Sequence, residues 1–227
     1  MTHAMFRGAC MLLGLLLGGC VETRFESPPG DNIETCDARW KGLWIGADAQ
    51  RRGELDLDDV AAFHVGPNCE FTILDQAEPG GPLKHVRVPL NFVHAHGRDY
   101  IVVADSALAG VVKLDPPHGI DPAPKKSYFI ARYRVRGERI EVYTVDSRRA
   151  AALVVDGTLD GTVDKTRTNL RVFVEGDRAR TLETLRRHAI FEAKPTLELV
   201  RSRLDLDAFE RSLRQPRPER PRDGQPR

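Results

Sequence analysis

Short alternations of apolar and polar residues dominate the middle of the chain. A two-residue period is typical of strands with one buried face. It predicts strands at 43–48, 60–65, 70–74, 85–92, 100–104, 110–114, 128–135 and 139–145. Turn signals rich in glycine and proline separate most of these segments, which favours an antiparallel meander, open or closed into a barrel.

The register of one hairpin can be predicted residue by residue. Gly137 and Glu138 form a two-residue turn with glycine first, as a type II′ turn requires. Both flanking strands alternate in agreement with one register. The expected cross-strand pairs are Val135 with Ile140, Tyr133 with Val142, Arg134 with Glu141 as a salt pair, and Arg132 with Tyr143 as a cation–π contact.

The hydrophobic period changes after this hairpin. Residues 147–155 are predicted to form a helix capped by Asp146 or Ser147, and residues 178–188 a second helix capped by Asp177. Two more strands are expected, at 170–174 and 196–200. The predicted fold class is therefore mainly β, with two short helices in the C-terminal third.

The N-terminus has the pattern of a secretory signal. A weakly basic start with His3 and Arg7 precedes a Leu-rich uncharged run that ends at residue 20. A helix needs roughly 20 apolar residues to cross a bilayer, so this run of about a dozen is too short for a transmembrane anchor.

The run ends in Leu17-Gly18-Gly19-Cys20, which resembles the lipobox of bacterial lipoproteins. The resemblance implies cleavage before Cys20 and acylation of its sulfur and its amine, the latter by palmitate or a similar chain. Several acyl chains give stable membrane anchoring. Val21, rather than Asp, follows the cysteine, and by the family's sorting habit this implies the periplasmic face of the outer membrane.

Two further cysteines, Cys36 and Cys69, form an isolated pair in the rest of the chain. In an oxidising compartment such a pair is expected to form a disulfide. The chain-entropy model assigns a loop of this length a stabilisation of roughly 3–4 kcal/mol. A zinc site is disfavoured because neither cysteine has a second ligand at CxxC spacing.

Charge and motifs exclude several function classes. The 34 Lys and Arg residues balance 33 Asp and Glu residues, so no nucleic-acid partner is expected. The sequence has no G-x-S-x-G elbow and no glycine-rich phosphate loop. We therefore assign no catalytic residue and no cofactor, and we do not expect an enzyme.

His94 and His96 are weak candidates for metal binding. Alternate residues of a strand point to the same side, so both imidazoles could reach one ion. However, they run into a turn at Gly97 and Arg98, where polar residues are needed anyway. We therefore assign no metal site.

Gly42-x-Trp44 looks like the start of the first strand in the lipocalin and calycin group of ligand-binding barrels. In that family the Trp closes the base of the barrel and an Arg from near the C-terminal end packs across it. The resemblance implies these roles for Trp44 and for Arg201 or Arg203, in a calycin-like barrel or half-barrel. Alternatively, Trp40 and Trp44 are simply large core and rim residues.

These observations divide the chain into four parts: a signal peptide at 1–19, a lipidated tether at 20–37, a single β-rich domain at 38–214 and a disordered Pro/Arg-rich tail at 215–227. The favoured function is a membrane-anchored, non-enzymatic module that binds a small apolar ligand or lipid. The alternative is a structural or interaction lipoprotein that docks on another envelope protein. A ligand binder needs a cavity on the order of 300 Å³ or more, whereas a scaffold has a packed interior.

Overall fold

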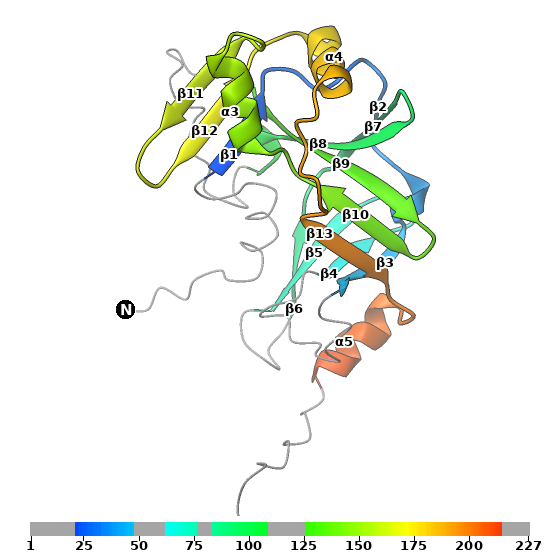
Figure 1. Ribbon diagram of the computed structural model, residues 1–227. Helices are drawn as coiled ribbons and strands as arrows, with labels where there is room; N and C mark the ends of the chain where they lie inside the picture. Colours follow the sequence, from blue (N-terminus) through cyan, green and yellow to red (C-terminus); the bar gives the residue numbers. More distant parts are fainter. Residues whose placement is uncertain (1–20, 48–61, 77–82, 109–125, 215–227) are drawn as a thin grey trace, which may run out of the picture.

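The computed structural model describes residues 21–47, 62–76, 83–108 and 126–214 (Figure 1). The predicted signal peptide, the lipidation site Cys20, the strand at 110–114 and the tail at 215–227 lie outside these ranges. Within the described ranges, no helix is long and apolar enough to cross a membrane.

Two antiparallel meanders form most of the sheet. The first consists of β3 (Gly42–Gly46), β4 (Ala62–Val65), β5 (Phe71–Gln76) and β6 (Leu83–Arg87). The second consists of β7 (Asn91–Ala95), β8 (Arg98–Ala104), β9 (Tyr128–Arg136) and β10 (Arg139–Tyr143), with the 3-10 turn η2 (Asp105–Leu108) after β8. The late strand β13 (Leu197–Arg201) pairs with β10 on one side and β3 on the other, and so joins the meanders.

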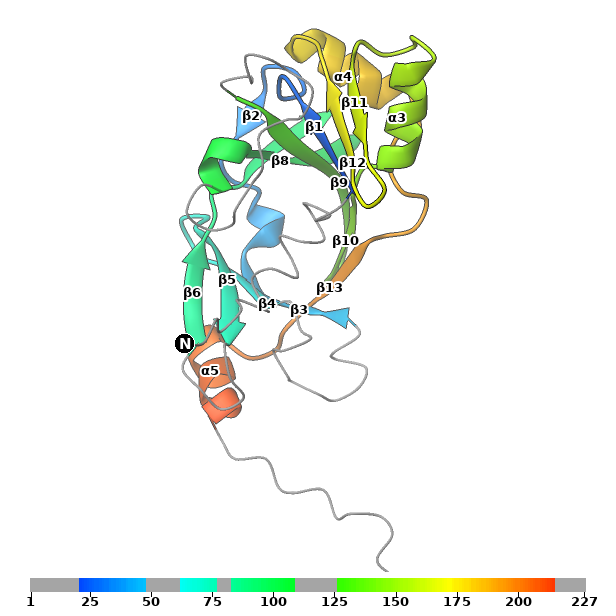
Figure 2. The same cartoon turned by 90° about the vertical axis from the view of Figure 1, so that its left-hand side faces the viewer.

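The joined sheet curls into a half-barrel (Figure 2). This confirms the predicted fold class: the protein is mainly β and antiparallel, consistent with a calycin-like half-barrel. The inner face carries one continuous apolar cluster that includes Trp40, Trp44 and Tyr133. The interior is nearly filled, with a cavity of about 40 Å³ lined only by apolar side chains.

The predicted hairpin register is confirmed. All four expected cross-strand pairs between β9 and β10 are present, and Gly137 has the positive φ, +58°, that its turn position needs. The guanidinium carbon of Arg132 lies 4.6 Å from the centre of the Tyr143 ring. Glu141 lies opposite Arg134 in the register, but its carboxylate forms an ion pair with Arg136, at 3.7 Å, instead of the expected Arg134.

The predicted strand at 85–92 is two strands. β6 ends at Arg87 and β7 begins at Asn91, with Pro89 between them. Proline has no backbone N–H to donate to a sheet, so it interrupts the ladder. The apolar run is continuous because Val88 and Leu90 stay buried through the break.

A branch of three strands leaves β9 at its start. It consists of β1 (Val21–Phe25), β12 (Leu170–Val174) and β11 (Gly161–Lys165). β1 runs parallel to β12 over its whole length and touches β9 at Phe25. The prediction of a tether at 20–37 is therefore wrong, because a buried strand begins directly after residue 20; Arg24 is 2% exposed and Phe25 0%.

The rest of the predicted tether also packs on the body. Residues 26–32 are irregular, as their prolines and glycine predict, but Pro28 and Pro29 are buried. The short strand β2 (Ile33–Glu34) then pairs with β7. The prolines and the glycine thus correctly predict the irregular backbone of residues 26–32. The burial of Pro28 and Pro29 has no signal in the neighbouring sequence.

Both predicted helices are present. α3 (Ser147–Val155) is capped by Asp146, whose side chain accepts a hydrogen bond from the Arg149 backbone N–H. α4 (Arg178–Arg187) is capped in the same way by Asp177. A third helix, α5 (Leu206–Arg214), was not predicted; its Phe209 and Leu213 are buried against the outer side of β3, β4 and β5.

Phe25 tests whether β1 is part of the folded body. We expect Phe25→Ala to lower the free energy of unfolding by roughly 3–5 kcal/mol, because it empties a fully buried site. Val21→Ala, at a 39% exposed position of the same strand, is the control and should change it by less than about 0.5 kcal/mol. Urea unfolding measures both; a flexible tether would make the two variants alike.

Candidate functional site

The segment 36–41, which we call the plug segment, closes one end of the half-barrel. It contains the 3-10 turn η1 (Ala38–Trp40), with Asp37 as its cap. The Trp40 side chain is 2% exposed and lines the small interior cavity. Its ring lies 5.3 Å from the Tyr133 ring and 5.9 Å from the Phe92 ring, so it fills the inside of the sheet.

The first connection of the plug segment is covalent. Cys36 forms a disulfide with Cys69, as predicted, with 5.3 Å between the two Cα atoms. Cys69 lies in the turn between β4 and β5, where its backbone N–H donates to the Gly66 carbonyl. The bond therefore ties the plug segment to the first meander.

The second connection is Arg201, at the end of β13. Its guanidinium carbon lies 4.3 Å from the centre of the Trp44 ring. The same guanidinium donates to the carbonyls of Lys41 and Arg39, the latter at 3.1 Å. Of the two arginines predicted to pack across Trp44, Arg201 is thus the one that does so.

Gly42 makes this arrangement possible. Its φ is +117°, and an added Cβ would lie 2.5 Å from a guanidinium nitrogen of Arg201. A side chain at this position would be strained by the backbone and would collide with the arginine. The glycine of the Gly42-x-Trp44 motif therefore has a physical role in the packing of Arg201.

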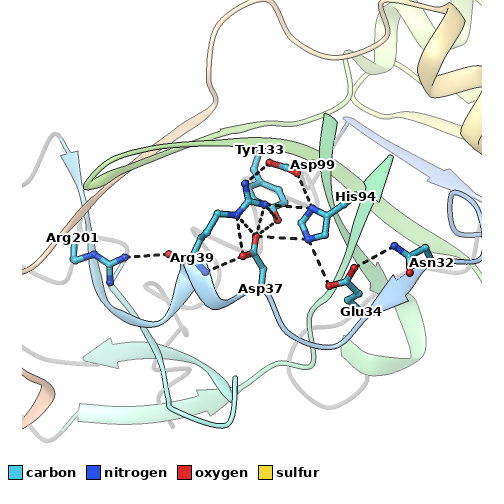
Figure 3. Close-up of polar contacts among 8 residues, drawn as sticks. All are labelled: Asn32, Glu34, Asp37, Arg39, His94, Asp99, Tyr133 and Arg201. Atoms are coloured by element: carbon cyan, nitrogen blue, oxygen red, sulfur yellow. Dashed lines mark hydrogen bonds and ion pairs between the residues drawn. The ribbon is translucent and has the colours of Figure 1, made fainter. Parts of the chain in front are cut away.

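The third connection is a polar cluster around Asp37 (Figure 3). The Arg39 Nε lies 3.0 Å from both carboxylate oxygens of Asp37, and its Nη1 lies 2.9 Å from Asp99 on β8. The Tyr133 hydroxyl on β9 donates a short hydrogen bond to Asp37. These contacts attach the plug segment to the second meander.

Asp37 and Tyr133 have fixed protonation states near neutral pH. Burial by itself would raise the pKa of Asp37, but hydrogen bonds from Arg39 and Tyr133 outweigh it and hold that pKa below its usual value. Burial and the hydrogen bond to Asp37 raise the pKa of Tyr133. The carboxylate stays ionised and the phenol stays protonated, so neither exchanges a proton readily.

His94 forms the exposed edge of this cluster. Its Nδ1 lies 2.7 Å from Asp99, while its Nε2 lies 3.9 Å from Glu34 and 4.0 Å from Asp37. In the part of the chain that the structure describes, no Ser, Thr or Cys side chain hydrogen-bonds to this imidazole. Among the described residues, the cluster is thus a network of ion pairs and hydrogen bonds between Asp, Arg, His and Tyr side chains.

The structure separates the two weak metal candidates. His94 lies on β7 and faces the cluster, whereas His96 lies in the turn to β8 with a φ of +50°. The strand ends at Ala95, so the rule that alternate residues share a face no longer applies to His96. Among the described residues, no group of three or more His, Cys, Asp or Glu side chains could hold a metal ion.

Sequence reasoning missed Asp37, Arg39 and Tyr133 as parts of one site. A local signal existed, because an Asp two residues before an Arg and directly before a turn is typical of a cap. The partner Tyr133 lies 96 residues away and carries no such signal. No protein-family model, no curated protein and no solved structure matches the chain.

The pH dependence of stability tests the ion pairs of Asp37. A depressed folded pKa contributes stability that is present above the unfolded pKa, about 3.8, and is lost as pH falls through the folded pKa. We expect Asp37→Asn to lower the free energy of unfolding by roughly 1–3 kcal/mol at neutral pH. The difference from wild type should shrink as the pH is lowered below about 4.

Urea titrations at several pH values measure this difference. Asp31→Asn is the matched control, because the Asp31 side chain is 90% exposed and its ion pair with Arg178 contributes little. If the Asp37→Asn difference were the same at acid and neutral pH, ionisation of Asp37 would not stabilise the fold.

Proposed function

We propose that the chain is a bacterial envelope lipoprotein, anchored through lipid on Cys20, whose folded body acts as a non-enzymatic interaction module. The anchor is supported by the Leu17-Gly18-Gly19-Cys20 lipobox. The Cys36–Cys69 disulfide supports an oxidising compartment, such as the periplasm. Together with Val21, these features favour the periplasmic face of the outer membrane.

The filled interior is the observation that carries the interaction role. Pockets for small molecules have volumes of about 300–1,000 Å³. The cavity here has about 40 Å³, because the Trp40 ring occupies the inside of the half-barrel. A body with such an interior would act through its surface, on another envelope component.

A non-enzymatic role is supported by the state of the polar cluster. Hydrogen bonds from Arg39 and Tyr133 keep the pKa of Asp37 low, while burial and the hydrogen bond to Asp37 keep the pKa of Tyr133 high. A general acid or base works best with a pKa near the operating pH. Neither group meets this condition.

One observation favours ligand binding as a second candidate. The Nε1 of Trp40 is buried and has no hydrogen-bond partner among the described residues. A small apolar ligand with one acceptor atom could satisfy this donor from the interior, if the surrounding side chains moved to enlarge the cavity.

The two cysteines of the N-terminal segment test the anchor. Metabolic labelling with palmitate should mark the wild-type protein and the Cys10→Ala variant, whereas Cys20→Ala should be unlabelled and should leave the membrane fraction. Cys10 lies within the same apolar run and is therefore the matched control. Equal labelling of all three proteins, or none of wild type, would refute lipidation at Cys20.

Native mass spectrometry tests the interior. The protein would be residues 20–227 with Cys20→Ser, exported behind a cleavable secretory signal. For an interaction module we expect a bare mass, lighter than the reduced chain by the two hydrogens of the Cys36–Cys69 bond. An additional mass that disappears on denaturation, and is lost in Trp40→Phe, would favour the ligand binder instead.

A further inference from the structure

An open groove of about 550 Å³ lies at the start of β1, next to the predicted lipidation site. One wall is α3 and the other is the tip of the β11–β12 hairpin (Figure 1). Val21 lies directly beside Leu170 in the parallel ladder, so the first residue of β1 and the hairpin tip share this end of the sheet. We call this surface the β1 groove.

Large apolar side chains are exposed to solvent in the β1 groove. Among the described residues, the large apolar side chains with clear exposure are Val21 at 39%, Val155 at 77% and Leu204 at 42%. Two of these three line the β1 groove. Val155 lies on the α3 face that also carries Arg148, seven residues earlier, so the helix presents both residues to the groove.

The charge of the β1 groove is entirely basic. Arg148, Lys165 and Arg167 line it and are exposed, and no Asp or Glu does so. None of the three has an ion pair within the described part of the chain. The nearest carboxylate on β1, Glu22, already pairs with Arg24 at 2.9 Å.

The proposed lipid on Cys20 indicates what the β1 groove contacts. In the sequence, Cys20 is the residue directly before Val21. Because Val21 pairs with Leu170 on β12 and lines the β1 groove, a lipid on the residue before it would join the body beside this groove. The exposed valines and the basic side chains then lie at the level of the lipid headgroups.

We propose that the β1 groove is a docking surface for an anionic phospholipid bilayer. The proposal rests on the proposed lipidation of Cys20 and specifies how the lipidated body sits. The three cations bind lipid phosphates, while Val21 and Val155 enter the boundary between headgroups and acyl chains. The acyl chains and the protein surface thus act together, and the body is held in one orientation.

Vesicle binding without the lipid tests the surface by itself. The protein is residues 20–227 with Cys20→Ser, mixed with vesicles of phosphatidylcholine alone or with added phosphatidylglycerol. We expect sedimentation with the anionic vesicles only, and loss of binding as salt is raised. Equal binding to both kinds of vesicle, or none to either, would overturn the proposal.

Two triple variants with equal loss of charge locate the surface. Each Lys or Arg near an anionic surface contributes roughly a fivefold factor in affinity, so Arg148→Gln, Lys165→Gln and Arg167→Gln together should weaken binding roughly a hundredfold. The control replaces Arg139, Arg203 and Arg211, which are exposed and lie at the start of β10, between β13 and α5, and on α5. None of these segments lines the β1 groove. The control should change binding less than about threefold, because distant charges are screened.

A probe in each exposed apolar patch measures insertion. Val155→Cys and Leu204→Cys each provide one free thiol for an environment-sensitive dye, since Cys36 and Cys69 are bonded to each other. Anionic vesicles should shift the emission of the Val155 probe to the blue and leave the Leu204 probe unchanged. Equal responses of the two probes, or equal weakening by the two triple variants, would refute docking through the β1 groove.

The result is separate from the test of lipidation. Palmitate labelling reports on Cys20 only, and the vesicle assays lack the lipid altogether. A labelled protein whose Cys20→Ser form ignores anionic vesicles would keep the proposed anchor and overturn the docking surface. A body that docks although the wild type carries no palmitate would refute the anchor alone.

Discussion

The stacking of Arg201 on Trp44 connects β13 with β3, two strands that are far apart in the sequence. β13 is the strand between the two meanders, and its last residue reaches back over the start of β3. The guanidinium lies 4.3 Å from the Trp44 ring and donates to carbonyls of the plug segment. The end of β13 is also held by its ladders to β3 and β10 and by the ion pair of Arg201 with Glu138 at 2.6 Å. The arginine thereby positions both the sheet closure and the segment that fills its interior.

The Asp37 cluster and the disulfide also hold the plug segment in place, through its two other connections to the sheet. Tyr133 and Asp99 attach the plug segment to β9 and β8, and Cys69 attaches it to the turn between β4 and β5. A buried carboxylate is costly unless it is paired, and here each polar contact also positions Trp40. The interior is therefore filled by Trp40, the residue whose position the polar network fixes.

Features governed by neighbouring residues could be predicted from the sequence. The turn at Gly137 set a hairpin register that alternation then supported, and Asp146 and Asp177 identified their helix starts. β1 could not be found in this way, because its five residues adjoin a Pro/Gly run and its main partner, β12, lies far along the chain. The same distinction holds for the candidate site. The disulfide and the role of Arg201 had sequence signals, whereas the contact between Asp37 and Tyr133 depends on the tertiary fold. α5 was a missed signal, since Leu206, Phe209 and Leu213 already mark one helical face.

The folding of β1 changes what a lipid on Cys20 does. A tether over 20–37 would let the body move up to roughly 60 Å from the bilayer, at about 3.4 Å per extended residue. With β1 in the sheet, the proposed lipid instead joins a rigid body at one fixed end, and the bilayer becomes a neighbour of α3 and the β11–β12 hairpin. α5 and the first meander lie at the other end of the molecule from α3 and the β11–β12 hairpin (Figure 1). A body docked as proposed would present the same surface to every partner, so that orientation would replace an internal pocket as the source of specificity.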